Sequence, residues 1–489
     1  LLAVALGVAV VLSYRRTVAR AWQRIEPIHP LRAALLILLI GPLFLAGRGG
    51  WQEIALTQSS AYFSGKPFAN FAAQNPLWGF FDSMSRRLDD SVNHFRSMDP
   101  EDAASIVATA RRPVAATVAP PVSVRRPNIL VIVWESGAAP AFGSTGGLAG
   151  VTPRFDSLRR EGILFRNMYA AGDRTDKGVT AVLSGFPGLP NGSIMKVPAK
   201  ARSLPMLSGD LRQAGYRTSF YYGGELEFAS MQAYLYEAGF DRIVGKSDFP
   251  RSSWNSKWGA HDGVVAQRVL DDLSRRTDPE PFFAVWLTLS SHEPFETPTP
   301  PRFPGSGWRE RYLSSMAYTD EVLGALVDSA RTRDWWDDTL VVIVSDHGRR
   351  VAEQDPAFRD AEALFHIPML WLGGALTTRD SVVTTIASQL DVAPTLVDLT
   401  GAADPERYRW GRSLLRPTSM PYAFYAFEQG FGLVTDRGYL VYDHRAGAFP
   451  TRVGLAAEPE EKLGRALLQL TYQSYLDLGR PRAGTRPAN

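Results

Sequence analysis

Hydrophobic and polar positions along residues 127–401 follow a pattern that predicts an α/β sheet flanked by helices. Continuous aliphatic and aromatic runs are typical of strands buried on both faces, and they occur at 128–134, 217–222, 281–289, 340–345 and 368–372. Segments with helical periodicity lie between these runs and after the last of them, at 204–214, 263–275, 312–331 and 387–399. Strands that alternate with helices in this way favour a mostly parallel sheet.

Two apolar runs, residues 1–13 and 33–47, precede this region and predict membrane-spanning helices within residues 1–50. The first run begins without Met, so we expect it to be the end of a helix whose start is missing. The loop between the runs is basic and contains Arg15, Arg16, Arg20 and Arg24. By the positive-inside rule this loop lies in the cytoplasm, which places the rest of the chain on the outer face. A buried core helix is the alternative for the second run.

The remaining segments complete a four-part organisation. Residues 51–126 are first aromatic-rich and helical in pattern, then rich in Ala, Val and Pro, which predicts a juxtamembrane helical segment and a linker. Residues 127–401 form the expected α/β domain. Residues 402–489 contain a hairpin-like stretch at 424–442 and a helical stretch at 458–478, which predicts a small α+β subdomain.

Composition narrows the possible chemistry more than it narrows the fold. The chain has 489 residues and a formal net charge of +3, which is too weak to favour a nucleic-acid partner. It has no cysteine, which excludes disulfides, thiolate metal sites and a cysteine nucleophile. Seven histidines limit how many metal ions imidazole groups can hold.

Polar side chains follow three of the predicted strands. Glu135 follows the run at 128–134, Ser290-Ser291-His292 the run at 281–289, and Asp346-His347 the run at 340–345. Because the carboxyl ends of strands in an open α/β sheet form its ligand-binding rim, we expect these groups to converge. Two carboxylates and an imidazole suit Mn²⁺, Mg²⁺ or Zn²⁺. Considered alone, Asp346 could instead cap a helix and His347 could be a surface residue.

The stretch from Ala171 to Gly185 supplies a candidate nucleophile. Gly172 frees the backbone, and Thr175 lies at the start of a predicted helix, where unpaired N–H groups favour a developing negative charge. A nearby metal ion lowers the pKa of a bound hydroxyl group and turns it into a nucleophile. The alternative is that Thr175 only caps the helix, as threonine often does.

Several motifs in order resemble one known family. They are Glu135 after an aliphatic run, Arg174-Thr175-Asp176, Ser291-His292-Glu293-Pro294-Phe295 and Ser345-Asp346-His347-Gly348, with further similarity at Thr152–Leu158, Trp258–Asp262 and Gln389–Thr395. Together they resemble the extracytoplasmic catalytic domain of the lipoteichoic acid synthase and phosphoglycerol transferase family, in the alkaline phosphatase and sulfatase superfamily. The resemblance covers roughly residues 127–401 and implies the central sheet of that superfamily.

The resemblance also implies a reaction and a set of site residues. One Mn²⁺-type ion would be held by Glu135, Thr175, Asp346 and His347. Thr175 would attack the phosphorus of a phospholipid such as phosphatidylglycerol, diacylglycerol would leave, and a glycan or polymer hydroxyl would take the phosphoglycerol. His292 matches the family's active-site histidine, with a hydrogen-bonding role behind the site as its alternative. The family layout places such an enzyme in the bacterial cytoplasmic (inner) membrane, with the catalytic domain on the periplasmic side.

One departure from the family concerns recognition of the donor. Lipoteichoic acid synthases carry Trp-x-Arg after the strand that matches 217–222, whereas this chain reads Tyr221-Tyr222-Gly223-Gly224-Glu225, as in the Gram-negative-type branch. Arg174 and Lys177 lie close to Thr175 in sequence and could supply charge for the phosphate instead. We also expect Trp258 and His261 to contact substrate, although His261 could equally be structural.

Four other functions compete with phosphoglycerol transfer. A sulfatase needs a formylglycine precursor that the Arg174–Gly178 turn lacks, and a two-zinc phosphodiesterase needs more histidine and aspartate ligands. A phosphoethanolamine transferase is closer in chemistry, but the members known to us are disulfide-bonded. A non-catalytic membrane scaffold is the alternative from a different class. The chain retains all five residues expected in the site, which argues against a scaffold; they are Glu135, Thr175, His292, Asp346 and His347.

Overall fold

The computed structural model describes residues 13–14, 30–51, 54–76, 79–80, 84, 92–114, 117–349, 364–428, 430–454 and 458–479. The chain forms two compact units, Leu1–Leu56 and Thr57–Asn489. The predicted strands and helices of residues 127–401 all lie in the second unit, as does the 402–489 segment. The apolar run at 1–12 and the four loop arginines lie outside the described residues.

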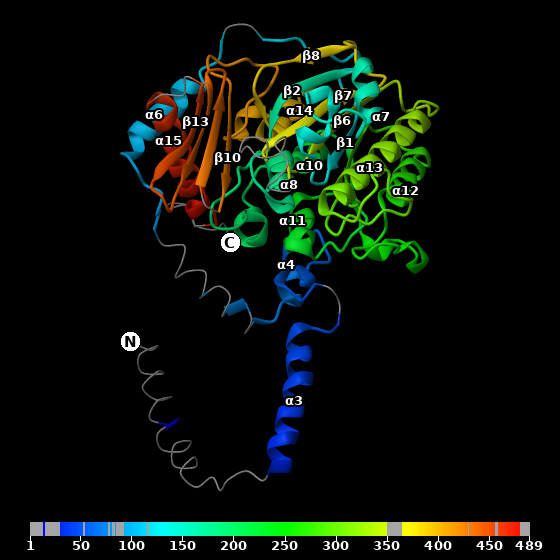
Figure 1. The fold of residues 1–489 in the computed structure, drawn as a ribbon, viewed down its shortest axis with the longest axis vertical. Coiled ribbons are helices and arrows are strands. Elements are labelled where there is room, and N and C mark those ends of the chain that lie inside the picture. The colour runs from blue at the N-terminus through cyan, green and yellow to red at the C-terminus, as the bar shows by residue number, and fades with distance from the viewer. Residues whose placement is uncertain are drawn as a thin grey trace. The chain divides into compact units, whose positions relative to one another are not determined.

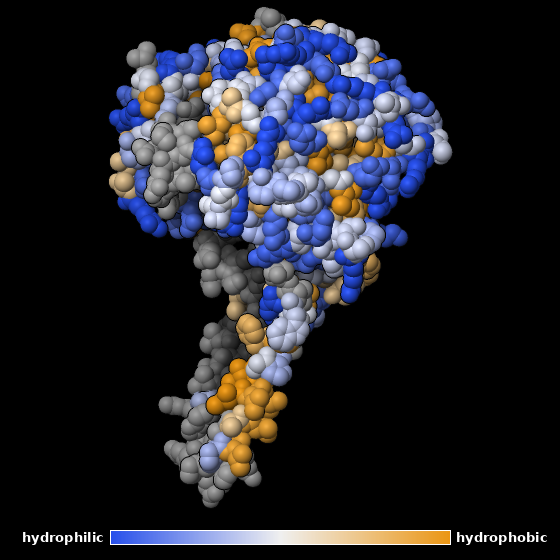
Figure 2. All heavy atoms as spheres, turned by 45° about the vertical axis from the view of Figure 1, so that its right-hand side comes forward, coloured by the Kyte–Doolittle hydropathy of each residue, from blue (hydrophilic) through white to orange (hydrophobic). Residues whose placement is uncertain are grey.

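The first unit contains helix α3 (Pro30–Arg48), which covers the second apolar run. Its leucine, isoleucine and phenylalanine side chains are mostly exposed on all sides of the helix, and Figure 2 shows them as a hydrophobic surface. In the described part of the chain, no helix is both long and apolar enough to cross a membrane.

The second unit is built around a large sheet whose described strands follow the order β4-β3-β5-β1-β6-β7-β2-β8, with β9 paired to β2 (Figure 1). The strands are β1 (Asn128–Trp134), β2 (Ile163–Tyr169), β3 (Arg217–Tyr222), β4 (Arg242–Val244), β5 (Phe282–Leu287), β6 (Thr339–Ser345), β7 (His366–Leu372), β8 (Ser381–Val383) and β9 (Ala387–Ser388). Strands β4, β3, β5, β1 and β6 are parallel. Strand β7 is antiparallel to both of its neighbours, so the sheet is mostly parallel, as predicted.

Alternate residues of the central strands face two layers of helices. In β1, Leu130, Ile132 and Trp134 pack with α7 (Pro153–Leu158), α12 (Asp262–Ser274) and α13 (Trp308–Ala330). The other face, beginning with Ile129, packs with four helices, α8 (Thr175–Ser184), α10 (Leu207–Gln213), α11 (Met231–Ala238) and α14 (Val392–Thr400). Burial on both faces explains why these strands read as continuous apolar runs.

The helix predicted at 387–399 begins later than expected. Ala387 and Ser388 form β9, which pairs with β2, and the Ser388 hydroxyl group accepts a hydrogen bond from the Leu390 N–H at the start of a short 3₁₀ turn. Helix α14 therefore starts at Val392 and ends at Thr400, before Gly401. The hydroxyl group of Ser388 takes up the Leu390 N–H while the backbone of Ser388 is extended, so the helix cannot begin at Ala387.

A second sheet lies beyond α14 and contains antiparallel strands β10 (Tyr422–Phe427), β11 (Gly430–Thr435), β12 (Gly438–Asp443) and β13 (Ala448–Gly454). Helices α6 (Pro100–Ala110) and α15 (Glu458–Asp477) pack against this sheet and against each other (Figure 1). Residues 117–122, which we expected to belong to a linker, are hydrogen-bonded to the segments that follow β7 and α14. Val118 donates its N–H to the carbonyl oxygen of Leu415, and the carbonyl oxygen of Pro121 accepts the N–H of Thr377.

A buried carboxyl group on α13 predicts how stability depends on pH. Asp320 accepts the backbone N–H groups of Arg154 and Phe155, each at 2.8 Å, and burial raises its pKa to about 7. The folded protein therefore keeps this proton at pH values where the unfolded chain has lost it. From about pH 4 to about pH 7, we expect this group to lower the free energy of unfolding by up to about 1.4 kcal/mol per pH unit.

Urea unfolding of the wild type and Asp320→Asn between pH 5 and pH 8 measures this effect. The variant loses one acceptor but cannot ionise, so it should be less stable than the wild type at pH 5, and the difference should shrink as the pH rises. A difference that stays constant or grows would show that Asp320 is ionised in the folded protein across this range.

Candidate active site

The three predicted strand ends meet because β5, β1 and β6 are neighbours in the sheet. Ile132 of β1 is in register with Trp286 of β5 and with Ile343 of β6, so the three carboxyl ends lie at one level. Glu135 follows β1, and Asp346 and His347 follow β6. The convergence expected from the sequence is therefore present in the structure.

Glu135, Asp346 and His347 form a buried cluster whose potential ligand atoms lie within 4.8 Å of one another. His347 Nε2 is 3.6 Å from Glu135 Oε1 and 3.5 Å from Asp346 Oδ2. At most 6% of any of the three residues is exposed to solvent. In the described part of the chain this is the group of acidic and histidine side chains whose spacing could accommodate a metal ion.

The electrostatics of the cluster fit a bound cation. Asp346 Oδ1 accepts the backbone N–H groups of Ser136 and His347, but Oδ2 is buried without a hydrogen-bond partner in the described structure. Burial and the neighbouring charge of Glu135 raise the pKa of Asp346 well above its usual range. Burial also acts to raise the pKa of Glu135, but His292 and His347, together with hydrogen bonds from Asp346 and Ser136, outweigh it and leave that pKa lowered. A divalent cation would satisfy the unpaired oxygen and allow both acids to ionise.

Backbone groups orient the histidine of this cluster. His347 Nδ1 lies 2.8 Å from the carbonyl oxygen of Gly348, to which it donates in the tautomer that leaves Nε2 unprotonated. Nε2 is the atom that faces Glu135 and Asp346. Fixing one ring nitrogen on a carbonyl so that the other can bind metal is the usual arrangement for a histidine ligand.

Thr175 is the first residue of α8, and its side chain faces the cluster. Its hydroxyl group donates to Glu135 Oε2 at 3.0 Å and lies 3.5 Å from His347 Nε2. The N-cap residue of α8 is Arg174, whose side chain makes no capping hydrogen bond. The hydroxyl group of Thr175 is therefore directed to the acidic cluster and does not cap the helix.

Close packing holds α8 against the end of β6. A Cβ atom at Gly178 would lie 1.9 Å from the backbone oxygen of Asp346, so the helix can approach this closely only with glycine there. The buried side chain of Gln389 accepts the N–H of Ala171 at 2.9 Å and donates to the carbonyl oxygen of Asp346 at 2.6 Å. Gln389 thereby links the segment that leads to Thr175 with the strand end that carries Asp346.

His292 lies in the same cavity, on the loop that follows β5. Its Nδ1 is 2.8 Å from the carbonyl oxygen of Glu293, and its ring meets Trp258 edge to face at 5.2 Å. Trp258 Nε1 donates to that same carbonyl oxygen at 2.6 Å. Trp258 therefore supports the His292 loop and does not itself line the cavity among the described residues.

The cavity has a volume of about 810 Å³, and Glu135, Thr175, His292 and His347 lie in its wall. Its described lining also includes three cationic residues, Arg174, Lys196 and Arg349. Neither Lys196 nor Arg349 was identified from the sequence. Arg349 directly follows the Asp346-His347-Gly348 motif, and this position could have predicted that it lies in the site. The sequence around Lys196 contains no motif that would have predicted the same for Lys196.

Two predicted substrate contacts lie away from the described lining of the cavity. Lys177 is buried and pairs with Asp173 Oδ1 at 2.9 Å. His261 is buried with Nδ1 3.3 Å from Ser290 Oγ, and burial lowers its pKa. The neighbouring Asp262 accepts the N–H groups of Leu289 and Ser290, so this stretch supports the backbone of the β5 loop.

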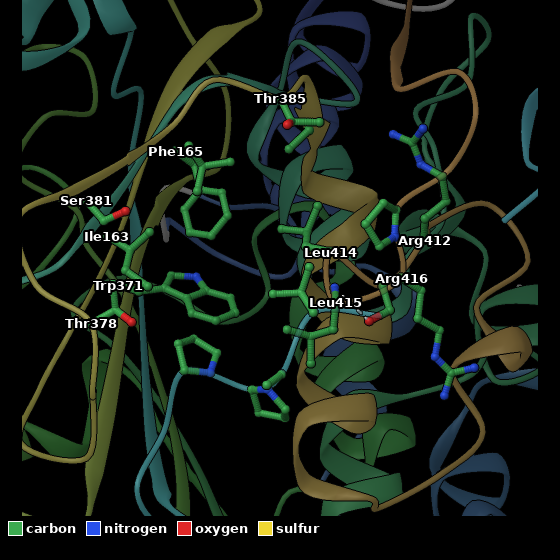
Figure 3. A pocket seen from close by; sticks show the side chains of 18 of the residues that line it. Ile163, Phe165, Trp371, Thr378, Ser381, Thr385, Arg412, Leu414, Leu415 and Arg416 are labelled. Atoms are coloured by element: carbon green, nitrogen blue, oxygen red, sulfur yellow. Dashed lines mark hydrogen bonds between the residues drawn. The ribbon is translucent and has the colours of Figure 1, made fainter. Parts of the chain in front are cut away.

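A second cavity of about 510 Å³ lies between β2, β7 and the 412–421 segment (Figure 3). Its walls are mainly apolar and include Phe165, Trp371 and Leu414. The guanidinium groups of Arg412 and Arg416 point away from it, toward Asp391 and Asp398, with which they pair. Its described lining lacks the acidic and histidine cluster that lies beside the first cavity.

Comparisons with known proteins cover the part of the chain that contains these residues. The sulfatase family model matches residues 127–402. Phosphoglycerol transferase I of Escherichia coli is 26% identical over 220 residues, which cover 40% of this chain and 28% of that protein. The lipoteichoic acid synthase-like protein YvgJ of Bacillus subtilis is 21% identical over 317 residues, covering 60% of this chain and 51% of the relative. The chain therefore spans about half or less of the length of these relatives.

Solved structures show the same fold. A protein of the alkaline phosphatase superfamily from Vibrio parahaemolyticus has a TM-score of 0.66 and 27% identity, covering 78% of this chain and 97% of that one. The lipoteichoic acid synthase LtaP from Listeria monocytogenes has a TM-score of 0.64 and 16% identity, covering 78% and 98%.

Proposed function

This chain belongs to the sulfatase family, and we propose that it is a metal-dependent transferase that moves phosphoglycerol from phosphatidylglycerol to a hydroxyl group of a glycan or polymer. The observation that carries the proposal is the hydroxyl group of Thr175, 3.0 Å from Glu135 and 3.5 Å from His347 in a buried acidic cluster. A phosphoglycerol transferase and a lipoteichoic acid synthase-like protein among the relatives support the choice of reaction.

Transfer would proceed through a covalent intermediate on Thr175. In the first step Thr175 Oγ1 forms a bond to phosphorus, and the bond from phosphorus to the diacylglycerol oxygen breaks. Glu135 Oε2, to which the attacking hydroxyl group donates its hydrogen bond, takes the proton of that group, and His292 Nε2 supplies a proton to the departing oxygen. In the second step the acceptor hydroxyl group gives its proton to His292 and its oxygen bonds to phosphorus. The bond from phosphorus to Thr175 Oγ1 breaks, and this oxygen takes back its proton from Glu135.

Glu135, Asp346 and His347, together with the Thr175 oxygen, would hold the metal ion. When bound, Mn²⁺, or Mg²⁺ or Zn²⁺ in its place, would lower the pKa of the Thr175 hydroxyl group and offset the charge of the phosphate. The side chains themselves fix the geometry, since Glu135 and His347 hold the Thr175 oxygen while α8 directs its N-terminus toward the incoming anion.

The charges around the cavity favour a donor with a neutral headgroup. Three carboxylates of the described lining are each paired with a cation, namely Asp173 with Lys177, Asp176 with Lys196, and Glu293 with Arg349. Glu225, in the turn that replaces the Trp-x-Arg motif, pairs with Lys246 at 3.0 Å. These three carboxylates are therefore already neutralised and are not available to the ammonium group of phosphatidylethanolamine, whereas the uncharged glycerol of phosphatidylglycerol needs no such partner.

We place the enzyme at the periplasmic face of the bacterial cytoplasmic membrane. A phospholipid donor requires access to the bilayer, and the exposed apolar side chains of α3 supply surface that favours lipid over water. The basic residues between the two apolar runs support a cytoplasmic location for that loop.

Incubation of the purified full chain with Mn²⁺ and liposomes tests the proposal. Phosphatidylglycerol should give diacylglycerol and a glycerol phosphate adduct on Thr175, detected by peptide mass spectrometry. Phosphatidylethanolamine should give neither. Diacylglycerol from phosphatidylethanolamine alone would identify a phosphoethanolamine transferase. Release of free glycerol phosphate, with no transfer to any added glycan, would identify a hydrolase, and metal binding without turnover of either lipid would favour a non-catalytic scaffold.

A further inference from the structure

Phosphoryl transfer to Thr175 requires positive charge in addition to the metal ion. The two non-bridging phosphate oxygens carry negative charge throughout the reaction, and protein cations placed beside them stabilise the transition state. The sequence suggests Lys177 for this role because it lies two residues after Thr175. The structure does not support that choice.

Lys177 is committed to a different contact. Its side chain is 4% exposed, and its ammonium group lies 2.9 Å from Asp173 Oδ1. A Cβ atom at Gly172 would lie 2.6 Å from Cβ of Lys177, so the backbone packs directly on the stem of this lysine. Lys177 therefore stabilises the loop that leads into α8 and is not part of the described lining of the cavity.

Lys196 has the properties that Lys177 lacks. Its side chain is 47% exposed and lines the cavity together with Thr175. Its ammonium group lies 3.0 Å from Oδ2 of Asp176, the residue that directly follows Thr175. We infer that Lys196 is the substrate-binding lysine of this enzyme and contacts a non-bridging oxygen of the phosphate group that Thr175 attacks. This inference rests on the proposed function.

The position of Lys196 is fixed by its surroundings. The short 3₁₀ turn Ile194–Lys196 is capped by Ser193, whose hydroxyl group also donates to the carbonyl oxygen of Asp176 at 3.3 Å. Ile194 and Met195 are buried, which leaves Lys196 as the residue of this turn that reaches the cavity. The turn is thereby attached to the first turn of α8, which carries Thr175.

Asp176 provides the anchor for the ammonium group. Its side chain is 3% exposed, and Oδ2 accepts no hydrogen bond within the described structure apart from its ion pair with Lys196. An ammonium group has three N–H donors, so it can hold Asp176 and a phosphate oxygen at the same time. The pair keeps the charge near Thr175 before substrate binds, which lowers the entropic cost of recognition.

Binding of glycerol 1-phosphate to the full chain, measured by calorimetry with Mn²⁺ present, tests this role. Lys196→Gln should weaken binding about tenfold or more, because it removes a charge-assisted hydrogen bond. Lys196→Arg should restore most of the affinity. Lys66→Gln, the same change at an exposed lysine outside the cavity, should have no effect. The affinity for Mn²⁺ should be equal in all four proteins, since Lys196 is not a metal ligand.

Two results would overturn the inference. One is unchanged glycerol 1-phosphate affinity in Lys196→Gln, and the other is a parallel loss of Mn²⁺ affinity, which would indicate a disturbed fold. Failure of the proposed function gives a different result. In that case the wild type transfers nothing from phosphatidylglycerol, but Lys196→Gln still loses affinity for glycerol 1-phosphate. Lys196 would then bind phosphate as inferred, in an enzyme that uses another donor.

Discussion

Replacing Thr175 with valine is expected to lower the rate of phosphoglycerol transfer by on the order of 10⁴-fold or more, with metal binding retained. Valine has nearly the shape of threonine but no oxygen, so it removes the nucleophile while it preserves the start of α8. The described structure offers no substitute in the cluster. The hydroxyl group of Ser136, which also contacts the cluster, is fully buried and donates to Glu135 Oε1 at 2.8 Å.

Thr180→Val is the matched control for this experiment. Thr180 lies in the same helix and is buried, and its hydroxyl group donates to the carbonyl oxygen of Asp176 at 2.7 Å. This variant should lose about 1 kcal/mol of stability and remain active. Diacylglycerol release, calorimetric Mn²⁺ affinity and Tm are measured for the wild type and both variants. Near-normal release by Thr175→Val would remove Thr175 as the nucleophile.

Replacing Asp346 with asparagine is expected to change stability in opposite directions with and without metal. In metal-free protein, Asp346 and Glu135 are two buried acids with one unpaired oxygen between them. Asparagine keeps the acceptor for the N–H groups of Ser136 and His347, but it removes the charge. We therefore expect the metal-free variant to be about 1–3 kcal/mol more stable than the wild type.

With Mn²⁺ the order should reverse. The wild type should gain stability as ligand concentration rises above its Kd, whereas Asp346→Asn, which lacks a charged ligand, should gain much less. Urea unfolding in chelator and in Mn²⁺ measures both effects. Asp210→Asn is the control, because Asp210 is buried but already neutralised by Arg407 at 2.5 Å. It should be destabilised in both conditions. If Mn²⁺ stabilised the wild type and Asp346→Asn by the same amount, Asp346 would not be a ligand of the ion.

The acidic cluster could be predicted from sequence because its residues follow buried strands directly. A strand buried on both faces has a clear apolar pattern, and the side chain after it must lie at the sheet rim. Pattern and sheet order therefore determine where Glu135 and Asp346 lie. The same pattern predicted strand β3, whose bounds, Arg217–Tyr222, match the predicted run.

The cations around the cavity could not be predicted in this way. Residues two apart on a helix point about 200° away from each other, so Lys177 cannot face the same side as Thr175. Lys196 approaches through a tertiary contact, the bond from Ser193 to Asp176, which leaves no periodic signal in the sequence. Strand β2 was also missed, because Arg166 and Asn167 interrupt its apolar pattern where its register with β7 shifts.

The packing of α6 against α15 has a consequence for how the protein is made in the cell. Helix α6 precedes the large sheet in the chain, and α15 follows all the strands, yet Val107 of α6 and Leu467 of α15 share one core with Phe424 and Phe431. A ribosome therefore releases α6 long before its partner exists. Until residues beyond 458 have emerged, the apolar face of α6 must remain uncovered, which makes this stage of synthesis the one at which a nascent chain would need a chaperone.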